Sequence, residues 1–73
     1  MITVQATGVL TIVFQLEEMK IRKDSMESIK FLGTKQCRAN GAMFDGPICY
    51  VVMTSGRDLY INATSEELEA RSA

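Results

Sequence analysis

Residues 48–62 read ICYVVMTSGRDLYIN, and this stretch indicates the fold class more strongly than any other part of the chain. Residues 48–54 are largely apolar on both faces, as in a strand that is covered on both sides. Ser-Gly at positions 55 and 56 is a tight-turn sequence. Leu59 and Ile61 then alternate with polar residues, which is typical of a half-buried strand. The stretch therefore predicts a β-hairpin.

A short helix is predicted directly after this hairpin. Thr64 and Glu67 have the spacing of a capping box, in which the two side chains satisfy free backbone N–H groups at the helix start. Two successive glutamates also place negative charge in the first turn, where the helix dipole favours it. We expect a helix over about residues 65–71 that docks through Leu68 and Ala70.

The N-terminal third predicts further strands. Residues 2–7 alternate between apolar and polar side chains, which indicates a first strand with one buried face. After a turn at Gly8, every second residue is a large apolar one. This pattern predicts a central strand with one fully apolar face. Its residues are Leu10, Ile12, Phe14 and Leu16. Residues 17–23 suit a half-exposed strand.

Residues 24–33 allow two interpretations. Asp24 and Glu27 fit a second capping box, and Gly33 could follow a helix end. However, Ile29 and Phe31 also alternate as in a strand that follows a turn. The pattern favours a turn followed by a strand over residues 28–38.

Length and composition indicate one globular domain over residues 1–73. The chain is 47% hydrophobic and 23% charged, as in ordinary folded proteins. A chain of 73 residues is near the lower limit for an unaided hydrophobic core. We expect a mainly β (α+β) fold: a small antiparallel sheet or partly open barrel of about five strands, with a short C-terminal helix.

The two cysteines and the apolar segments bear on the cellular compartment. Cys37 and Cys49 are not spaced as a metal-binding pair, and a secreted domain of this size usually has more cysteines. We expect both thiols to be reduced and buried. The start of the chain lacks the pattern of a signal peptide, and the apolar stretch at 9–16 is too short to span a bilayer. The sequence predicts a cytoplasmic protein without membrane association.

Residue types needed for common catalytic sites are missing. The chain has no histidine, which is the usual general base near neutral pH and the commonest zinc ligand. It also contains no Cys-x-x-Cys pair, no phosphate-binding loop and no Gly-x-Gly-x-x-Gly motif. We therefore expect no enzymatic activity, no catalytic residues, no metal, no cofactor and no small-molecule substrate.

Basic residues concentrate in the middle of the chain, although the net charge is −1. Such a cluster can follow a phosphate backbone, or it can be a solvated strand face that discourages edge-to-edge pairing. The small size of the cluster favours the second interpretation. The basic-patch candidates are Lys20, Arg22, Lys23, Lys30, Lys35 and Arg38.

Two segments are candidates for contact with another protein. Met43 and Phe44 lie in a glycine-flanked loop, where apolar side chains are unfavourable unless they are packed or used in binding. Ile2, Thr3 and Val4 belong to the N-terminal strand, which could add to the sheet of a partner if it lies at an edge.

The segment YVVMTSGRDLYINATSEELEAR, residues 50–71, is similar to the ending of LytTR-type DNA-binding domains and of small FlbD-like proteins. In length and in its lack of catalytic residues, the whole chain resembles small phage-encoded proteins that bind host bacterial RNA polymerase. That resemblance is to a class and implies a non-enzymatic regulator of transcription in the host cytoplasm. The alternatives are a nucleic-acid-binding β domain that uses the basic patch, and a structural subunit that oligomerises through an edge strand.

Overall fold

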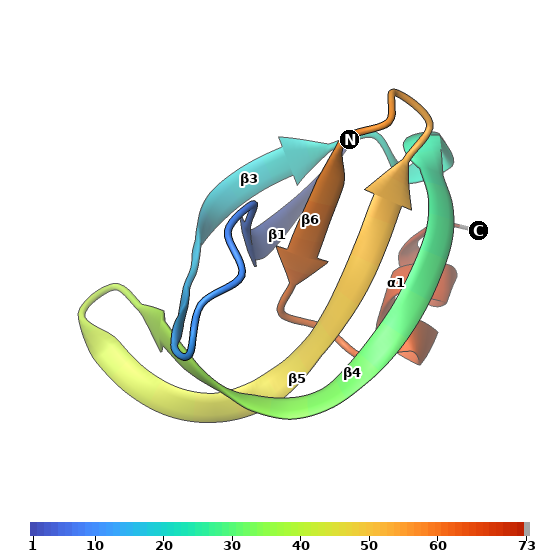
Figure 1. The fold of residues 1–73 in the computed structure, drawn as a ribbon. Coiled ribbons are helices and arrows are strands. Elements are labelled where there is room, and N and C mark those ends of the chain that lie inside the picture. The colour runs from blue at the N-terminus through green and yellow to red at the C-terminus, as the bar shows by residue number, and fades with distance from the viewer. Residues whose placement is uncertain (73) are drawn as a thin grey trace.

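The computed structural model describes residues 1–72. Strands account for most of the chain, and one helix follows them (Figure 1). In chain order the elements are β1 (Ile2–Thr7), β2 (Phe14–Gln15), β3 (Glu17–Ile21), the short 3-10 helix η1 (Lys23–Ser25), β4 (Met26–Ala39), β5 (Ala42–Met53), β6 (Asp58–Ile61) and the helix α1 (Ser65–Ser72).

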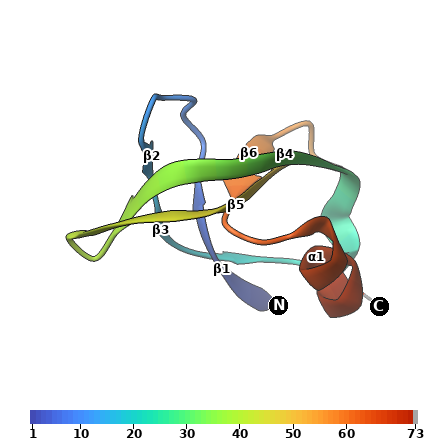
Figure 2. The ribbon, with the colours of Figure 1, turned by 90° about the horizontal axis from the view of Figure 1, so that it is seen from below.

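The six strands form one sheet in the order β2-β4-β5-β6-β1-β3. All neighbouring pairs are antiparallel except β2 and β4, which are parallel. Only Leu16 separates β2 from β3, although these strands occupy opposite edges of the sheet. One continuous segment therefore pairs with β4 at its start and with β1 at its end. The sheet curls around as a result, which Figures 1 and 2 show from two directions.

The predicted fold class is confirmed, with two differences of detail. The sheet has six strands rather than about five, because the segment at 14–21 bends at Leu16 and counts as two. The sheet is also mixed rather than fully antiparallel. Both differences come from the same bend, which lets Phe14 and Leu16 become buried beside β4.

The core has two parts, because β5 is covered on both of its faces near its middle. The larger part lies where α1 packs, and Leu68 from the helix meets alternate residues of β5 and β6 there. Its fully buried members include Cys49, Val51, Leu59, Ile61 and Leu68. The smaller part consists of Phe14, Leu16, Cys37 and Ile48. No helix among residues 1–72 is long and apolar enough to cross a bilayer.

The predicted C-terminal hairpin and capped helix are confirmed. The backbone N–H of Glu67 donates to Thr64 Oγ1 at 3.1 Å, and the two side chains also lie within hydrogen-bond distance. Leu68 is fully buried, as expected of the docking residue. Ala70 is exposed, so the expectation that it also docks is wrong.

The ambiguous stretch at 24–33 is a turn followed by a strand, as the pattern favoured. η1 makes the turn, and β4 then pairs with β5 along nearly its whole length. The register of this pairing shifts between Phe31 and Gly33, and Gly33 has a φ of 94°. Gly33 therefore serves a bulge in a strand rather than a helix end, since glycine adopts this backbone conformation without strain.

The central strand predicted from Leu10 to Leu16 is wrong in its first half. Only Phe14 and Leu16 are buried, and β2 comprises just two residues. Leu10 and Ile12 lie in the loop that joins β1 to β2, with exposed fractions of 67% and 94%. The bend toward β4 buries the later apolar residues and leaves the earlier ones without a neighbouring strand.

Candidate functional site

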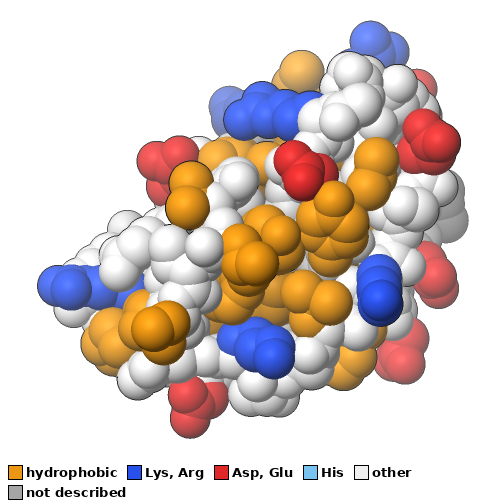
Figure 3. All heavy atoms as spheres, viewed as in Figure 1, with side chains coloured by type: hydrophobic (Ala, Val, Ile, Leu, Met, Phe, Trp, Pro, Cys, Tyr) orange, Lys and Arg blue, Asp and Glu red, His pale blue; other side chains and the backbone are white. Residues whose placement is uncertain are grey.

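Large exposed apolar side chains occur mainly in two segments of the described structure. One is the loop between β1 and β2, and the other is the first part of β5. We call these side chains together the apolar end. Its members are Val9, Leu10, Ile12, Met43 and Phe44. Figure 3 shows apolar side chains gathered at one end of the molecule and over the face of the sheet beside it.

The β4–β5 hairpin projects beyond the rest of the sheet. Asn40 and Gly41 form its turn, with positive φ angles of 53° and 79°. Such angles at both central positions suit the twist of a two-residue hairpin, and Asn-Gly is a favoured sequence there. β6 pairs with β5 only from Cys49 to Val52. The prediction that Met43 and Phe44 lie in a loop is wrong, because the tight Asn40-Gly41 turn lets β5 begin at Ala42 and pair with β4 from there. Both residues lie in the part of β5 that β6 does not reach.

Phe44 is exposed but its ring is held in place. A Cβ atom on Gly46 would lie 2.9 Å from Phe44 Cε2 and 2.8 Å from Asn62 Nδ2. Gly46 thus allows the ring and the amide to lie close against β5. Asn62 Nδ2 also donates to the Pro47 carbonyl at 2.9 Å.

Strand pairing through β4 connects the two segments of the apolar end. Phe14 pairs with Cys37, and Cys37 pairs with Phe44. Since neighbouring strands lie about 4.8 Å apart, the backbones at Phe14 and Phe44 are about 10 Å apart. The loop that carries Ile12 leads directly into Phe14 and rises from one face of the sheet in Figure 2.

The N-terminal candidates do not form an edge. β1 lies between β6 and β3, and β3 pairs with it from Ile2 to Ala6. Val4 is buried in the main core, Ile2 is half-buried and Thr3 is exposed. The proposed addition of this strand to a partner's sheet is therefore wrong, because the chain returns as β3 and occupies that side.

The six basic-patch candidates are all exposed, but they do not gather on one face. Lys20 lies on β3, while Arg22 and Lys23 lie at η1. Lys35 and Arg38 lie at the opposite end of β4, near the hairpin turn, and Lys30 lies between the two groups. In Figure 3 the basic side chains are separated by apolar and neutral surface. Arg57, in the β5–β6 turn, lies around the same hollow as Lys20 and Arg22. The sequence pattern did not group Arg57 with these residues, because it is distant from them along the chain.

Three titratable groups have shifted pKa values. Burial raises the pKa of Cys37 and, together with the nearby Glu67 and Glu69, that of Cys49. These thiols stay protonated and unreactive near neutral pH. The hydrogen bond from Tyr50 Oη to Asp58 Oδ2, at 3.0 Å, raises the pKa of that tyrosine. None of these groups is activated as a nucleophile or base, and residues 1–72 contain no cluster of three or more potential metal ligands.

Comparison with known proteins transfers no residue role to this chain. No protein-family model, curated protein or solved structure matches it. The candidate site therefore depends on the chemistry of the surface, and the apolar end is its most distinctive feature.

Proposed function

We propose that this protein acts by binding a larger protein through the apolar end. The observation that carries the proposal is the exposure of five large apolar side chains in two segments that β4 connects through strand pairing. Burying apolar surface contributes about 25 cal/mol per Å², so covering these side chains would favour association. Met43 and Phe44 are also residue types that are enriched at protein interfaces.

The surroundings of the apolar end indicate the chemistry of the partner. Arg38 pairs with Met43 across the hairpin, and Lys35 lies three positions before it on β4. Asp45 is the acidic residue nearby on β5. A partner with an apolar groove and acidic residues around it would suit this arrangement, because complementary charges speed association and oppose incorrect partners.

The resemblance to small phage-encoded regulators makes bacterial RNA polymerase the first partner to test. In this proposal the protein is a non-enzymatic regulator that alters transcription by occupying a surface of the polymerase. The direction of the effect, inhibition or activation, would follow from the surface that it covers.

The direct test measures binding of the purified chain to bacterial RNA polymerase by biolayer interferometry. We expect the double variant Ile12→Ser and Phe44→Ser to weaken binding by about tenfold or more, because central aromatic and aliphatic contacts dominate interface energies. Phe31→Ser is the matched control, since Phe31 is 48% exposed but lies on β4 outside the apolar end.

The outcomes separate the alternatives. Equal binding by the wild type and the double variant would contradict the assigned surface. If the wild type does not bind polymerase, a pull-down from lysate with the same variants tests other proteins. Binding to DNA that weakens steeply with salt would instead favour the nucleic-acid alternative, and a concentration-dependent dimer in light scattering would favour the structural-subunit alternative.

A further inference from the structure

A hollow of about 460 Å³ lies between η1 and the β5–β6 turn. The backbone N–H of Thr54 donates to the Ser25 carbonyl at 2.7 Å and joins these two walls. β5 separates the hollow from the apolar end, since Met53 is at one end of this strand and Met43 is near the other. The two surfaces therefore lie far apart on a molecule whose longest dimension is 30 Å.

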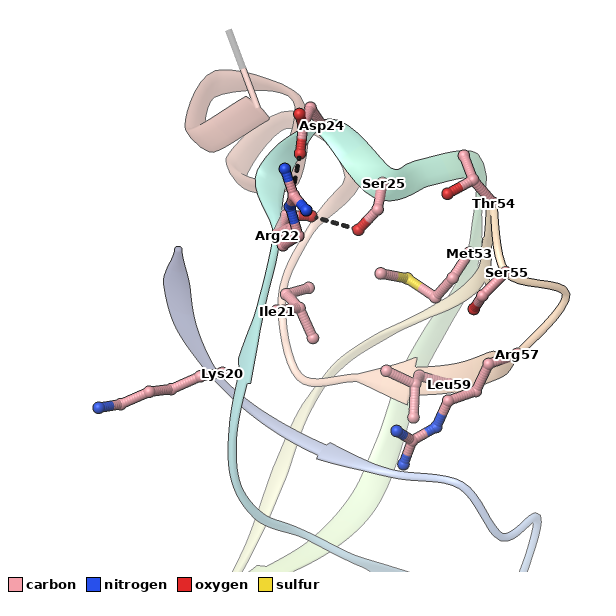
Figure 4. Close-up of a pocket in the computed structure, with 10 residues that line it drawn as sticks. All are labelled: Lys20, Ile21, Arg22, Asp24, Ser25, Met53, Thr54, Ser55, Arg57 and Leu59. Atoms are coloured by element: carbon pink, nitrogen blue, oxygen red, sulfur yellow. Dashed lines mark hydrogen bonds and ion pairs between the residues drawn. The ribbon is translucent and has the colours of Figure 1, made fainter.

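The floor of the hollow is apolar. Ile21 from β3, Met53 from β5 and Leu59 from β6 line it, and their side chains point toward one another in Figure 4. The hydroxyl-bearing residues Ser25 and Thr54 lie at its margin. These three side chains belong to the main core and are only 8%, 6% and 1% exposed, so the floor is a small apolar surface below a polar margin.

The rim of the hollow is positively charged. Arg22, directly after β3, and Arg57 in the β5–β6 turn supply this charge. Lys20 also belongs to the lining, and Asp24 is the one acidic residue in it. Arg22 Nε lies 3.6 Å from Asp24 Oδ1, but both side chains are more than 70% exposed, so the pair is weak. Within residues 1–72, Lys20 and Arg57 form no ion pair. Lys20 extends outward in Figure 4, which leaves Arg22 and Arg57 nearer the floor.

We propose that this hollow binds an acidic peptide segment that carries an apolar side chain, supplied by a partner protein. The carboxylates of such a segment would meet the cations of the rim, and its apolar side chain would cover the floor. No aromatic side chain lines the hollow, so it offers no surface on which a nucleotide base could stack. A free phosphate would meet the rim but leave the floor uncovered.

This inference is independent of the proposed function, because the two surfaces share no residue. If both surfaces bind, this small protein contacts two separate sites at once, either on one partner or on two. Linked contacts of this kind increase the overall affinity beyond that of each contact alone.

The test uses a fluorescein-labelled hexapeptide of alternating glutamate and leucine, measured by fluorescence polarisation at low salt. We expect Arg57→Gln to weaken binding about fivefold and Asp24→Asn to strengthen it about twofold, in the range of exposed charge pairs. Lys30→Gln removes a positive charge from the middle of β4, outside both surfaces, and is the matched control. We expect it to leave binding unchanged.

A peptide of alternating glutamine and leucine tests the role of charge. Equal binding of the two peptides, or equal weakening by Lys30→Gln and Arg57→Gln, would overturn the proposal, as would no binding of the acidic peptide at millimolar concentration. Tighter binding of adenosine monophosphate or inorganic phosphate than of the peptide would also overturn it. Circular dichroism checks that each variant is folded, and amide NMR shifts at Ser25 and Thr54 provide a readout that needs no variant.

Discussion

Two segments of the chain, residues 8–13 and residues 48–53, are rich in aliphatic side chains and differ in where those side chains lie. Val51 is fully buried, whereas Ile12 is 94% exposed. β5 lies between β4 and β6 and has α1 over one face, so its backbone and side chains are both covered. The loop at 8–13 belongs to no strand.

This difference shows that an apolar pattern becomes a buried strand only where tertiary neighbours are present. Phe14 and Leu16 continue the pattern of the loop and are buried, because they meet Cys37 and Ile48. The start of β2 at Phe14 therefore divides one apolar segment into an exposed half and a buried half. In the proposed function the exposed half contributes to binding, and the following predictions test how differently the two halves contribute to stability.

The largest expected effect comes from the same substitution made in the two regions. Leu68→Ala should lower the free energy of unfolding by about 2–5 kcal/mol, because it removes a fully buried side chain and leaves a cavity. Leu10→Ala should change it by less than about 0.5 kcal/mol, since Leu10 is 67% exposed. Urea denaturation followed by circular dichroism measures both. Similar losses from the two variants would mean that the loop is packed in solution.

A smaller loss of packing energy is expected from a substitution at Phe14, where the exposed and buried halves of the apolar segment meet. Phe14→Leu should loosen β2 over Cys37 and increase the alkylation rate of that thiol about fivefold, the effect of ~1 kcal/mol of lost packing. Cys49 lies in the core near α1, so its alkylation rate should not change. Mass spectrometry after iodoacetamide treatment separates the two thiols. Equal acceleration at both would indicate global unfolding instead of local opening.

The helix cap should contribute less to the free energy of unfolding than the buried side chain of Leu68 does. Thr64→Ala removes the acceptor for the Glu67 N–H and should cost about 1 kcal/mol in urea denaturation. Thr64→Ser keeps that acceptor and is the matched control. A loss from the serine variant as large as that from alanine would show that the hydrogen bond is not the source of the effect.

The smallest expected effect is a change in the titration of Tyr50. Its hydrogen bond to Asp58 raises its pKa above the ordinary value of 10.0, so the folded chain holds this proton more tightly than the unfolded chain. The pair therefore contributes stability below pH 10 that is lost as the pH rises through the raised pKa. Asp58→Asn should lower the pKa toward 10.0, measured by ¹³C NMR of the tyrosine rings. An unchanged titration would contradict the contact.

The sequence by itself determined the local features that depend on near neighbours in the chain. The turn at Gly56, the capping box at Thr64 and the burial of Leu68 follow from turn chemistry, caps and apolar spacing. The turn and the cap need contacts over only a few residues, and the spacing of Leu68 after the cap identifies it as the docking residue.

Only the tertiary structure decided which apolar residues are buried and which charged side chains lie near one another. Alternation in residues 10–16 is the same for a buried strand and an exposed loop, so nothing local predicts the bend at Leu16. That bend exists because β4 and Ile48 offer a surface that buries Phe14. Arg57 joins the cations near η1 for a similar reason: the Thr54–Ser25 hydrogen bond brings together two turns that are distant in sequence.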